Sequence, residues 1–345
     1  MRTLVLPAFT ALMILISGAA AHADQGPVDR VTLAEEVSFV PGAGLTRIVG
    51  TTLTLAAGES RHLRGRLQAK SDTENIVAMN ATIRCLSGST QVGVSSSASR
   101  NHEGSDTESY SVDGQLPLTA DLLFTAPTAG SYQCGLYGVT ASSSTTGYTL
   151  TAVPGSTWVE ASRSDQPGAH WWQNPVCNST GTSSTCSYIG PGQPASAFVF
   201  YEPGLPHDQW TVGAGTTAVQ ALANVTLTTC YRLTASCSPS QVPEAVRLPR
   251  GPGSKSVVRL RLEALQMNAA GSHTCENNAT TLTTATILDD AHHYTANLSL
   301  PRIPVLSTCG RKFMLRVYVE YVSGSPVKID GLQSTSLTNG MMLNL

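Results

Sequence analysis

The feature that most constrains this chain is a six-residue phrase that occurs twice, each time after an earlier cysteine. The copies are AGSYQC at 129–134 and AGSHTC at 270–275, 141 positions apart. Cys85 and Cys230 precede them, each within a run rich in β-branched residues. A phrase that repeats with its own pair of cysteines predicts a duplicated module stapled by disulfides.

The chain has eight cysteines, an even number that predicts disulfides in an exported protein. Two pairing schemes remain open. The repeat favours the bonds Cys85–Cys134, Cys230–Cys275, Cys177–Cys186 and Cys237–Cys309, whereas nearest-neighbour pairing in the C-terminal half gives Cys230–Cys237 and Cys275–Cys309. The sequence contains no CxxC motif and no zinc-finger spacing, so we interpret the cysteines as structural staples.

The first residues indicate export. Arg2 precedes an apolar run over 4–16, and 21–23 (AHA) has the small-x-small form that signal peptidase accepts. We therefore interpret 1–23 as a signal peptide and expect a secreted, extracellular protein. The apolar run is shorter than the ~20 residues that span a bilayer, so we expect no membrane span after signal cleavage.

Composition limits the classes of partner. Charged residues make up 13% of the chain, and the formal net charge is −2. The densest basic stretch, 247–261, is interrupted by Pro249 and Pro252, so it predicts no phosphate-binding stripe. We expect no nucleic-acid partner, and the expected partner is an extracellular protein or glycan of unknown identity.

The pattern between the cysteines is typical of short strands and turns. Apolar and charged residues alternate over 258–263, and a similar alternation covers 313–321, which predicts strands with one buried face. Gly/Pro pairs punctuate such runs along the chain. The predicted fold is all-β: two antiparallel β-sandwiches over 24–155 and 197–345, joined by a Trp/Pro-rich middle segment over 156–196.

The run GSYQC at 130–134 resembles the strand-F signature of immunoglobulin-like domains. In that family a tyrosine two residues before the second cysteine bonds its hydroxyl to the backbone. The resemblance implies an immunoglobulin-like sandwich with Cys85 on strand B, Cys134 on strand F and Tyr132 at the corner between strands E and F. The second copy departs from the signature, because His273 replaces the tyrosine. Fold resemblance implies no particular ligand.

Four tryptophans are candidate binding residues: Trp158, Trp171, Trp172 and Trp210. Gathered near the predicted 177–186 disulfide loop, they could stack on sugar rings or anchor a protein partner. The alternative is that they fill the junction between the two sandwiches. In an extended segment, Trp171 and Trp172 point to opposite faces, so one of them is a candidate for exposure.

One polar cluster has the chemistry of a metal site: Asp289, Asp290, His292 and His293. An exposed turn between two strands explains the same cluster. The chain has no GxSxG motif, and the GxGxxA pattern at 213–218 lacks the strand–turn–helix context of a dinucleotide site. No cofactor is predicted, and a triad assembled from distant residues remains open.

Five Asn-x-Ser/Thr sequons mark glycosylation sites if the source is a eukaryote: Asn80, Asn178, Asn224, Asn278 and Asn297. Taken together, the sequence favours a secreted, non-catalytic binding or surface-structural protein built from tandem modules. The alternatives are a secreted hydrolase and a carbohydrate-binding protein that uses an exposed tryptophan.

Overall fold

A computed structural model describes residues 27–72, 77–99, 115–141, 146–172, 188–200, 209–230, 255–288, 293–330 and 338–345. Every regular element in these ranges is a β-strand, and all strand pairs are antiparallel, which confirms the all-β prediction. The predicted signal peptide lies outside the described residues. Among those residues, no helix is long and apolar enough to cross a membrane.

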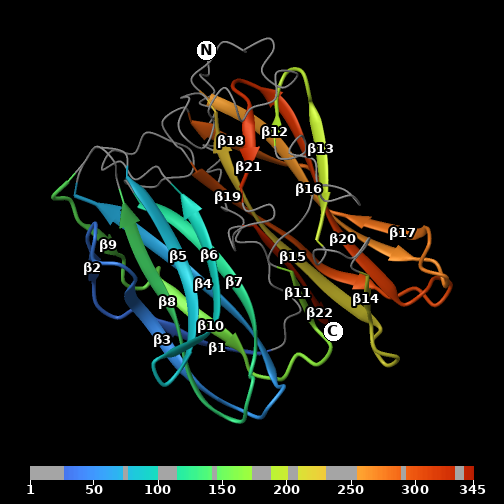
Figure 1. Ribbon diagram of the computed structural model, residues 1–345, viewed down its shortest axis with the longest axis horizontal. Helices are drawn as coiled ribbons and strands as arrows, with labels where there is room; N and C mark the ends of the chain where they lie inside the picture. Colours follow the sequence, from blue (N-terminus) through green and yellow to red (C-terminus); the bar gives the residue numbers. More distant parts are fainter. Residues whose placement is uncertain are drawn as a thin grey trace, which may run out of the picture.

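Two β-sandwiches follow one another along the chain and lie side by side (Figure 1). The first contains β1 (Val28–Thr32), β2 (Val37–Phe39), β3 (Thr46–Leu55), β4 (Ser60–Ser71), β5 (Ala78–Ser87), β6 (Thr90–Ser99), β7 (Gln115–Thr125), β8 (Gly130–Ala141), β9 (Leu150–Ala152) and β10 (Trp158–Ser162). One of its sheets, called sheet A here, has the order β1/β2, β9/β10, β4, β7, where a slash joins two short strands that share one position in the sheet. The other, sheet B, has the order β3, β8, β5, β6.

The second sandwich uses the rest of the described chain. Its strands are β11 (His170–Trp172), β12 (Tyr188–Ile189), β13 (Ala195–Val199), β14 (Trp210–Thr211), β15 (Ala218–Thr229), β16 (Lys255–Met267), β17 (Thr274–Ala279), β18 (Thr283–Leu288), β19 (His293–Pro304), β20 (Lys312–Ser323), β21 (Val327–Ile329) and β22 (Asn339–Asn344). Sheet C has the order β11/β12, β21/β22, β15, β19, and sheet D has the order β13/β14, β20, β16, β17/β18.

Both sandwiches therefore repeat one topology, with eight strand positions divided into two sheets of four. Positions 1, 8, 3 and 6 along each module form one sheet, and positions 2, 7, 4 and 5 form the other. This is the strand order of a jelly roll. The stretch 156–196, predicted as a separate middle segment, supplies β10 to the first sandwich and β11 to β13 to the second.

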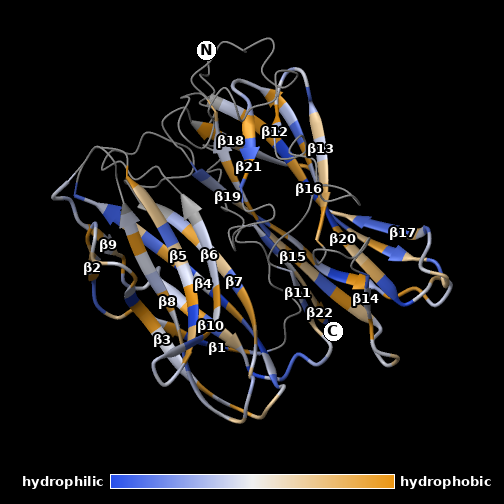
Figure 2. Ribbon diagram, viewed as in Figure 1, coloured by the Kyte–Doolittle hydropathy of each residue, from blue (hydrophilic) through white to orange (hydrophobic). Residues whose placement is uncertain are grey.

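Alternation along the strands explains where the two cores lie. In β16 the side chains of Val258, Leu260 and Leu262 are fully buried between the sheets, whereas Arg259 and Arg261 are partly exposed on the other face. Figure 2 shows the same alternation as orange and blue bands along the strands. The 258–263 and 313–321 patterns thus correctly predict β16 and β20, because each strand has one buried face.

The predicted Cys85–Cys134 disulfide is present, but its place in the fold differs from the resemblance. Cys85 in β5 and Cys134 in β8 face each other directly within sheet B, with 4.0 Å between their Cα atoms. An immunoglobulin-type disulfide joins two sheets. Here the bond joins two neighbouring strands of one sheet, so the assignment of these cysteines to strands B and F is wrong.

The tyrosine contact that the resemblance implies does occur. Tyr132 is 1% exposed, and its hydroxyl donates a hydrogen bond to the carbonyl oxygen of Thr128. The backbone N–H of Thr128 also donates to that hydroxyl, at 3.3 Å. The ring packs edge-on against Phe124, with 5.0 Å between centroids. Tyr132 therefore fixes the turn that leads from β7 into β8.

The two copies of the repeated phrase are not equivalent in the fold. Cys134 is fully buried in β8, a central strand of sheet B, whereas Cys275 is exposed in β17 at an edge of sheet D. Cys275 bonds to Cys309, so the predicted pairs Cys230–Cys275 and Cys237–Cys309 are wrong. Cys230 is disulfide-bonded as well. Cys177, Cys186 and Cys237 lie outside the described residues, so the Cys177–Cys186 and Cys230–Cys237 bonds stay predictions.

Peptide mapping of the non-reduced protein checks this pairing. We expect cross-linked peptides that contain Cys85 with Cys134 and Cys275 with Cys309, and each should separate on reduction. A peptide that joins Cys230 to Cys275 would contradict the structure and restore the pairing that the repeat suggests.

Replacing Tyr132 with phenylalanine tests the turn contact. Tyr132→Phe removes the hydroxyl that donates to the carbonyl of Thr128 and accepts from its N–H, so we expect the free energy of unfolding to fall by about 1 kcal/mol in urea denaturation. Tyr318→Phe, at a partly exposed position on β20, serves as the control and should change stability by less than about 0.5 kcal/mol. Equal effects of the two substitutions would rule out a special role for Tyr132.

Candidate functional site

The two sandwiches meet through the outer faces of sheets A and C and through β6 of sheet B. An apolar cluster at this contact, the docking interface, combines Leu123 of β7 with Leu222 of β15 and with Met341 and Leu343 of β22. Trp171 packs against the same cluster. These side chains point away from the core of their own sandwich, so only the other sandwich removes them from water. Their burial favours a fixed contact between the modules.

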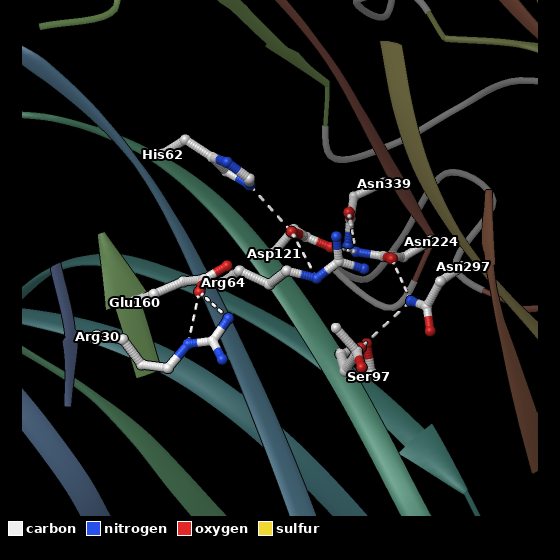
Figure 3. Close-up of polar contacts among 10 residues, drawn as sticks. Arg30, His62, Arg64, Ser97, Asp121, Glu160, Asn224, Asn297 and Asn339 are labelled. Atoms are coloured by element: carbon white, nitrogen blue, oxygen red, sulfur yellow. Dashed lines mark hydrogen bonds and ion pairs between the residues drawn. The ribbon is translucent and has the colours of Figure 1, made fainter. Parts of the chain in front are cut away.

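A buried carboxylate, Asp121 of β7, lies two residues before Leu123 on the same strand, and Figure 3 shows its polar contacts. Its Oδ1 is 2.9 Å from Nε2 of His62 and 3.7 Å from Nε of Arg64, both on β4. Burial raises the pKa of Asp121, but the Arg64 charge, the hydrogen bond and charge of His62, and a hydrogen bond from Asn224 outweigh burial and lower the pKa to about 2. The carboxylate is therefore ionised at neutral pH.

Asparagine side chains of the second sandwich complete this network. Asn224 of β15 donates from Nδ2 to Oδ2 of Asp121, at 3.2 Å, and to Oδ1 of Asn339, at 3.1 Å. Asn339 donates in turn to Oγ of Ser95 in β6, at 3.3 Å, and so returns to the first sandwich. Asn297 donates to Oδ1 of Asn224 at 2.5 Å. The second sandwich thus donates the hydrogen bonds that cross the docking interface to Asp121 and Ser95, and Figure 3 shows the contact between Asn224 and Asp121.

A His–Asp pair is also part of many catalytic triads, yet this pair has a structural setting. His62 and Asp121 are 3% and 2% exposed. A catalytic pair must reach a substrate, and here the second sandwich covers both side chains. The arrangement holds a charge inside an interface and orients the two modules.

The segment between the sandwiches, residues 163–169, is held from both sides and is called the linker. Asp165 accepts a hydrogen bond from the backbone N–H of Ser60 at 2.7 Å, and the N–H of Gln166 donates to the Ser60 carbonyl at 3.0 Å. From the second sandwich, Nε1 of Trp210 donates to the carbonyl of Gly168 at 2.6 Å. The linker is therefore part of the packed structure.

The row of residues that contains Asp121 continues across sheet A to the surface. Strand register places Arg30, Glu160, Arg64 and Asp121 side by side on β1, β10, β4 and β7, with alternating charge. Arg30 donates to Oε2 of Glu160 from Nε at 2.9 Å and from Nη2 at 2.6 Å. Its guanidinium also lies 4.1 Å from the ring centroid of Trp158. The exposed end of the row thus combines an aromatic ring with charged groups.

The four tryptophans have different surroundings. Trp172 and Trp210 are 2% and 7% exposed in the core of the second sandwich, so they are not available as a stacking surface. Trp172 and Trp210 were predicted as binding residues, and this prediction is corrected because both lie on the inner face of their sandwich. Trp171 is half-buried at the docking interface, as the junction alternative predicts. Trp158, half-buried on the outer face of sheet A, stays a candidate for binding.

His293, a member of the predicted metal cluster, belongs to a polar group on the outer face of sheet C. The group lies where β15 ends and β19 begins. Its Nδ1 is 2.7 Å from Oγ1 of Thr228 and 3.3 Å from Oδ2 of Asp330, and Asp330 also lies 3.3 Å from Nζ of Lys328. Burial raises the pKa of Asp330, but the hydrogen bond and charge of His293, the Thr228 hydroxyl and the Lys328 charge together lower it. The group pairs an imidazole with an ionised carboxylate.

The metal prediction receives no support from the described residues. No group of three or more His, Cys, Asp or Glu side chains in those ranges could hold a metal ion. Asp289, Asp290 and His292 lie outside them. The sequence signal at 289–293 therefore finds one residue of the His293–Asp330 group and misses Asp330, which directly follows β21 and lies 37 positions further along the chain.

The sequon residues also differ in accessibility. Asn224 is 2% exposed, and its Nδ2 is hydrogen-bonded in the docking interface, so the folded protein offers no room for a glycan there. Asn80 and Asn278 are half-buried and Asn297 is exposed, although its Nδ2 donates to Asn224. Asn178 lies outside the described residues. Glycosylation at Asn224 is thus the one sequon assignment that the structure contradicts.

Comparison with known proteins finds no matching family model and no matching curated protein. Solved structures give distant matches. The infectious bursal disease virus VP2 subviral particle is 18% identical over 46% of this chain and 42% of that one, with a TM-score of 0.24. The CBM22-1-CBM22-2 tandem domain of Paenibacillus barcinonensis Xyn10C is 11% identical, with 93% and 94% coverage and a TM-score of 0.22.

A third match, broad bean stain virus, is 8% identical over 96% of this chain and 93% of that one, with a TM-score of 0.22. All three scores are too low to transfer a function to this chain. Its functional sites must therefore be argued from its own residues.

Replacing Asp121 tests the polar part of the docking interface. Asp121→Asn leaves Arg64 and His62 without their buried anion, so we expect the free energy of unfolding at pH 7 to fall by about 3 kcal/mol in urea denaturation. The folded pKa of about 2 lies below the ordinary value of 3.8, so this carboxylate stabilises the fold above pH 3.8 and stops doing so as pH falls through 2. The difference between the proteins should therefore shrink across this window.

Asp29→Asn is the matched control, because Asp29 pairs with Arg163 at an exposed position. This substitution should change stability by less than about 1 kcal/mol at any pH. A wild-type unfolding curve for Asp121→Asn at pH 7 would contradict the role assigned to the carboxylate.

Proposed function

We propose that this protein is a secreted, non-catalytic binding or surface-structural protein. The observation that carries the proposal is the docking interface, in which buried hydrogen bonds from Asn224 and Asn339 hold two sandwiches in one orientation. A fixed pair of sandwiches presents its remaining sheet faces at set positions to a partner. The disulfide Cys275–Cys309, exposed at Cys275, fits the oxidising environment outside the cell.

Trp158 supports a carbohydrate-binding form of this proposal. The ring lies on the outer face of sheet A, beside Arg66 in the register of β10 and β4 and beneath the Arg30 guanidinium. Sugar rings stack on indole faces, and guanidinium groups bind hydroxyl and carboxylate oxygens. A sugar would occupy the ring face after Arg30 swings aside, and Glu160 would then accept hydrogen bonds from the sugar.

The second candidate function is hydrolysis, which the His293–Asp330 pair favours. Asp330 lies against Nδ1 of the imidazole, and the His293 side chain is 24% exposed. An imidazole oriented by a carboxylate is the common general base of hydrolases. Its nucleophile would have to come from another part of the chain or from water.

One experiment separates these functions. The secreted protein is incubated with insoluble cellulose, xylan, chitin and peptidoglycan, and bound protein and released soluble sugars are both measured. We expect retention on at least one material without release of sugars. Trp158→Ala should weaken that retention at least about fivefold, because an aromatic contact at the centre of a binding site contributes 1 kcal/mol or more.

Val322→Ala is the control, since Val322 is an exposed apolar residue on the second sandwich. It should bind like the unmodified protein. Release of soluble sugars that His293→Ala abolishes would assign the protein to the hydrolases instead. Absence of retention on every material would remove the glycan-binding form of the proposal.

A further inference from the structure

The outer face of sheet B contains two arginines that lack a counter-charge. Arg47 is exposed on β3, and Arg84 is half-buried on β5. Neither guanidinium has a hydrogen bond or an ion pair in the described part of the chain, and Nε of Arg84 is buried there without a partner. Two guanidinium groups without a carboxylate partner favour a ligand that supplies an anion.

Three arginines on the other outer faces form ion pairs, and Arg66 of sheet A bonds to Gln68. Arg30 contacts Glu160, Arg259 contacts Glu320, and Arg316 contacts Glu263. The pairs neutralise each guanidinium within the sheet. Sheet B differs because its two arginines remain available to an external anion.

Two glycines bring the arginines together. Gly50 and Gly135 are direct neighbours on β3 and β8, and Arg84 is the neighbour of Gly135 on the other side. The Arg47 side chain lies over both glycines: its Nε is 2.8 Å from the position of a Cβ at Gly50 and 3.4 Å from a Cβ at Gly135. The missing side chains let Arg47 lie flat across the sheet surface at this point.

Aromatic and polar groups surround the two arginines. Arg84 lies over the ring of Tyr137, 5.9 Å from its centroid, and Tyr137 faces Arg47 in the register of β8 and β3. On the opposite side, Thr52 and Gln133 are exposed neighbours that can hydrogen-bond to hydroxyl groups. The site thus combines two cations with neutral hydrogen-bonding groups on an open sheet face.

We propose that this face of sheet B binds the anionic group of an acidic glycan, either a carboxylate or a sulfate. Guanidinium groups bind such oxygens through two parallel hydrogen bonds. Thr52 and Gln133 then contact the hydroxyl groups of the neighbouring sugar. A sugar polymer fits this site better than a nucleic acid does, because two arginines make a single anion contact and the chain as a whole carries a net charge of −2.

The test measures binding of fluorescein-labelled oligogalacturonate and of a labelled heparin oligosaccharide by anisotropy, with single-stranded DNA as a third probe. We expect binding of at least one glycan. Arg47→Gln and Arg84→Gln should each weaken it about tenfold, and the double variant more than either single variant, because each loses a charge-assisted hydrogen bond. Binding should also weaken as salt increases. The glycan that binds identifies the anion as carboxylate or sulfate.

Two further variants sharpen the test. Arg163→Gln removes an exposed arginine from a different place and should leave binding unchanged. Gly50→Ala keeps both charges but inserts a methyl group where Arg47 lies, so it should weaken binding, with a thermal unfolding curve to check that the variant is folded. Wild-type affinity in the double variant, or equal affinity for DNA, would overturn the proposal.

This inference rests on the proposed binding function and adds a ligand class and a second site. The experiments can reject the site on sheet B without rejecting the proposed binding function. Retention on neutral polysaccharides that depends on Trp158, together with no affinity for acidic oligosaccharides, would retain the binding function and reject the site on sheet B.

Discussion

A buried carboxylate between two modules is the constraint on which this structure depends. Asp121 is compatible with burial because Arg64 and His62 approach it from its own sandwich and Asn224 from the other. Separation of the sandwiches would remove the Asn224 donor and expose Leu222 and its apolar neighbours to water. Charge and apolar burial therefore favour the same relative orientation. Such ionic contacts contribute less to stability than to the choice of one arrangement, because desolvation offsets much of their attraction.

The docked arrangement divides the surface of the protein. Sheets A and C lose part of their outer faces to each other, so functional contacts must use what remains: the edge of sheet A around Trp158, the upper part of sheet C around His293, and the outer face of sheet B. Repetition of the topology does not make these surfaces alike. Each sandwich has the same strand order, but the side chains that face outward differ, and so does their chemistry.

Sequence patterns predicted those features that depend on local order. Alternation at 258–263 predicted β16, and the repeated phrase predicted the Cys85–Cys134 disulfide. The resemblance to immunoglobulin-like domains implied the hydroxyl contact of Tyr132, which also exists. The second copy of the phrase was misleading, because the residues at 270–275, four of which match 129–134, lead into an edge strand rather than a central one. Asp121 and Asn224 lie 103 positions apart, and no local pattern connects them. The sequence does show polar residues beside apolar ones on the outward face of these strands. That pattern indicates a covered face only when the surface that covers it is known.

The anchored linker has a consequence for how the chain assembles. Its contacts with Ser60 on one side and Trp210 on the other keep it short and bent, which places the second sandwich next to the first sandwich of the same chain. Exchange of sandwiches between two molecules would require the linker to straighten and both anchors to break before any new interface could form. The linker thus sets the effective concentration of the correct partner within one chain, which favours closure within the molecule over swapped dimers even at high protein concentration.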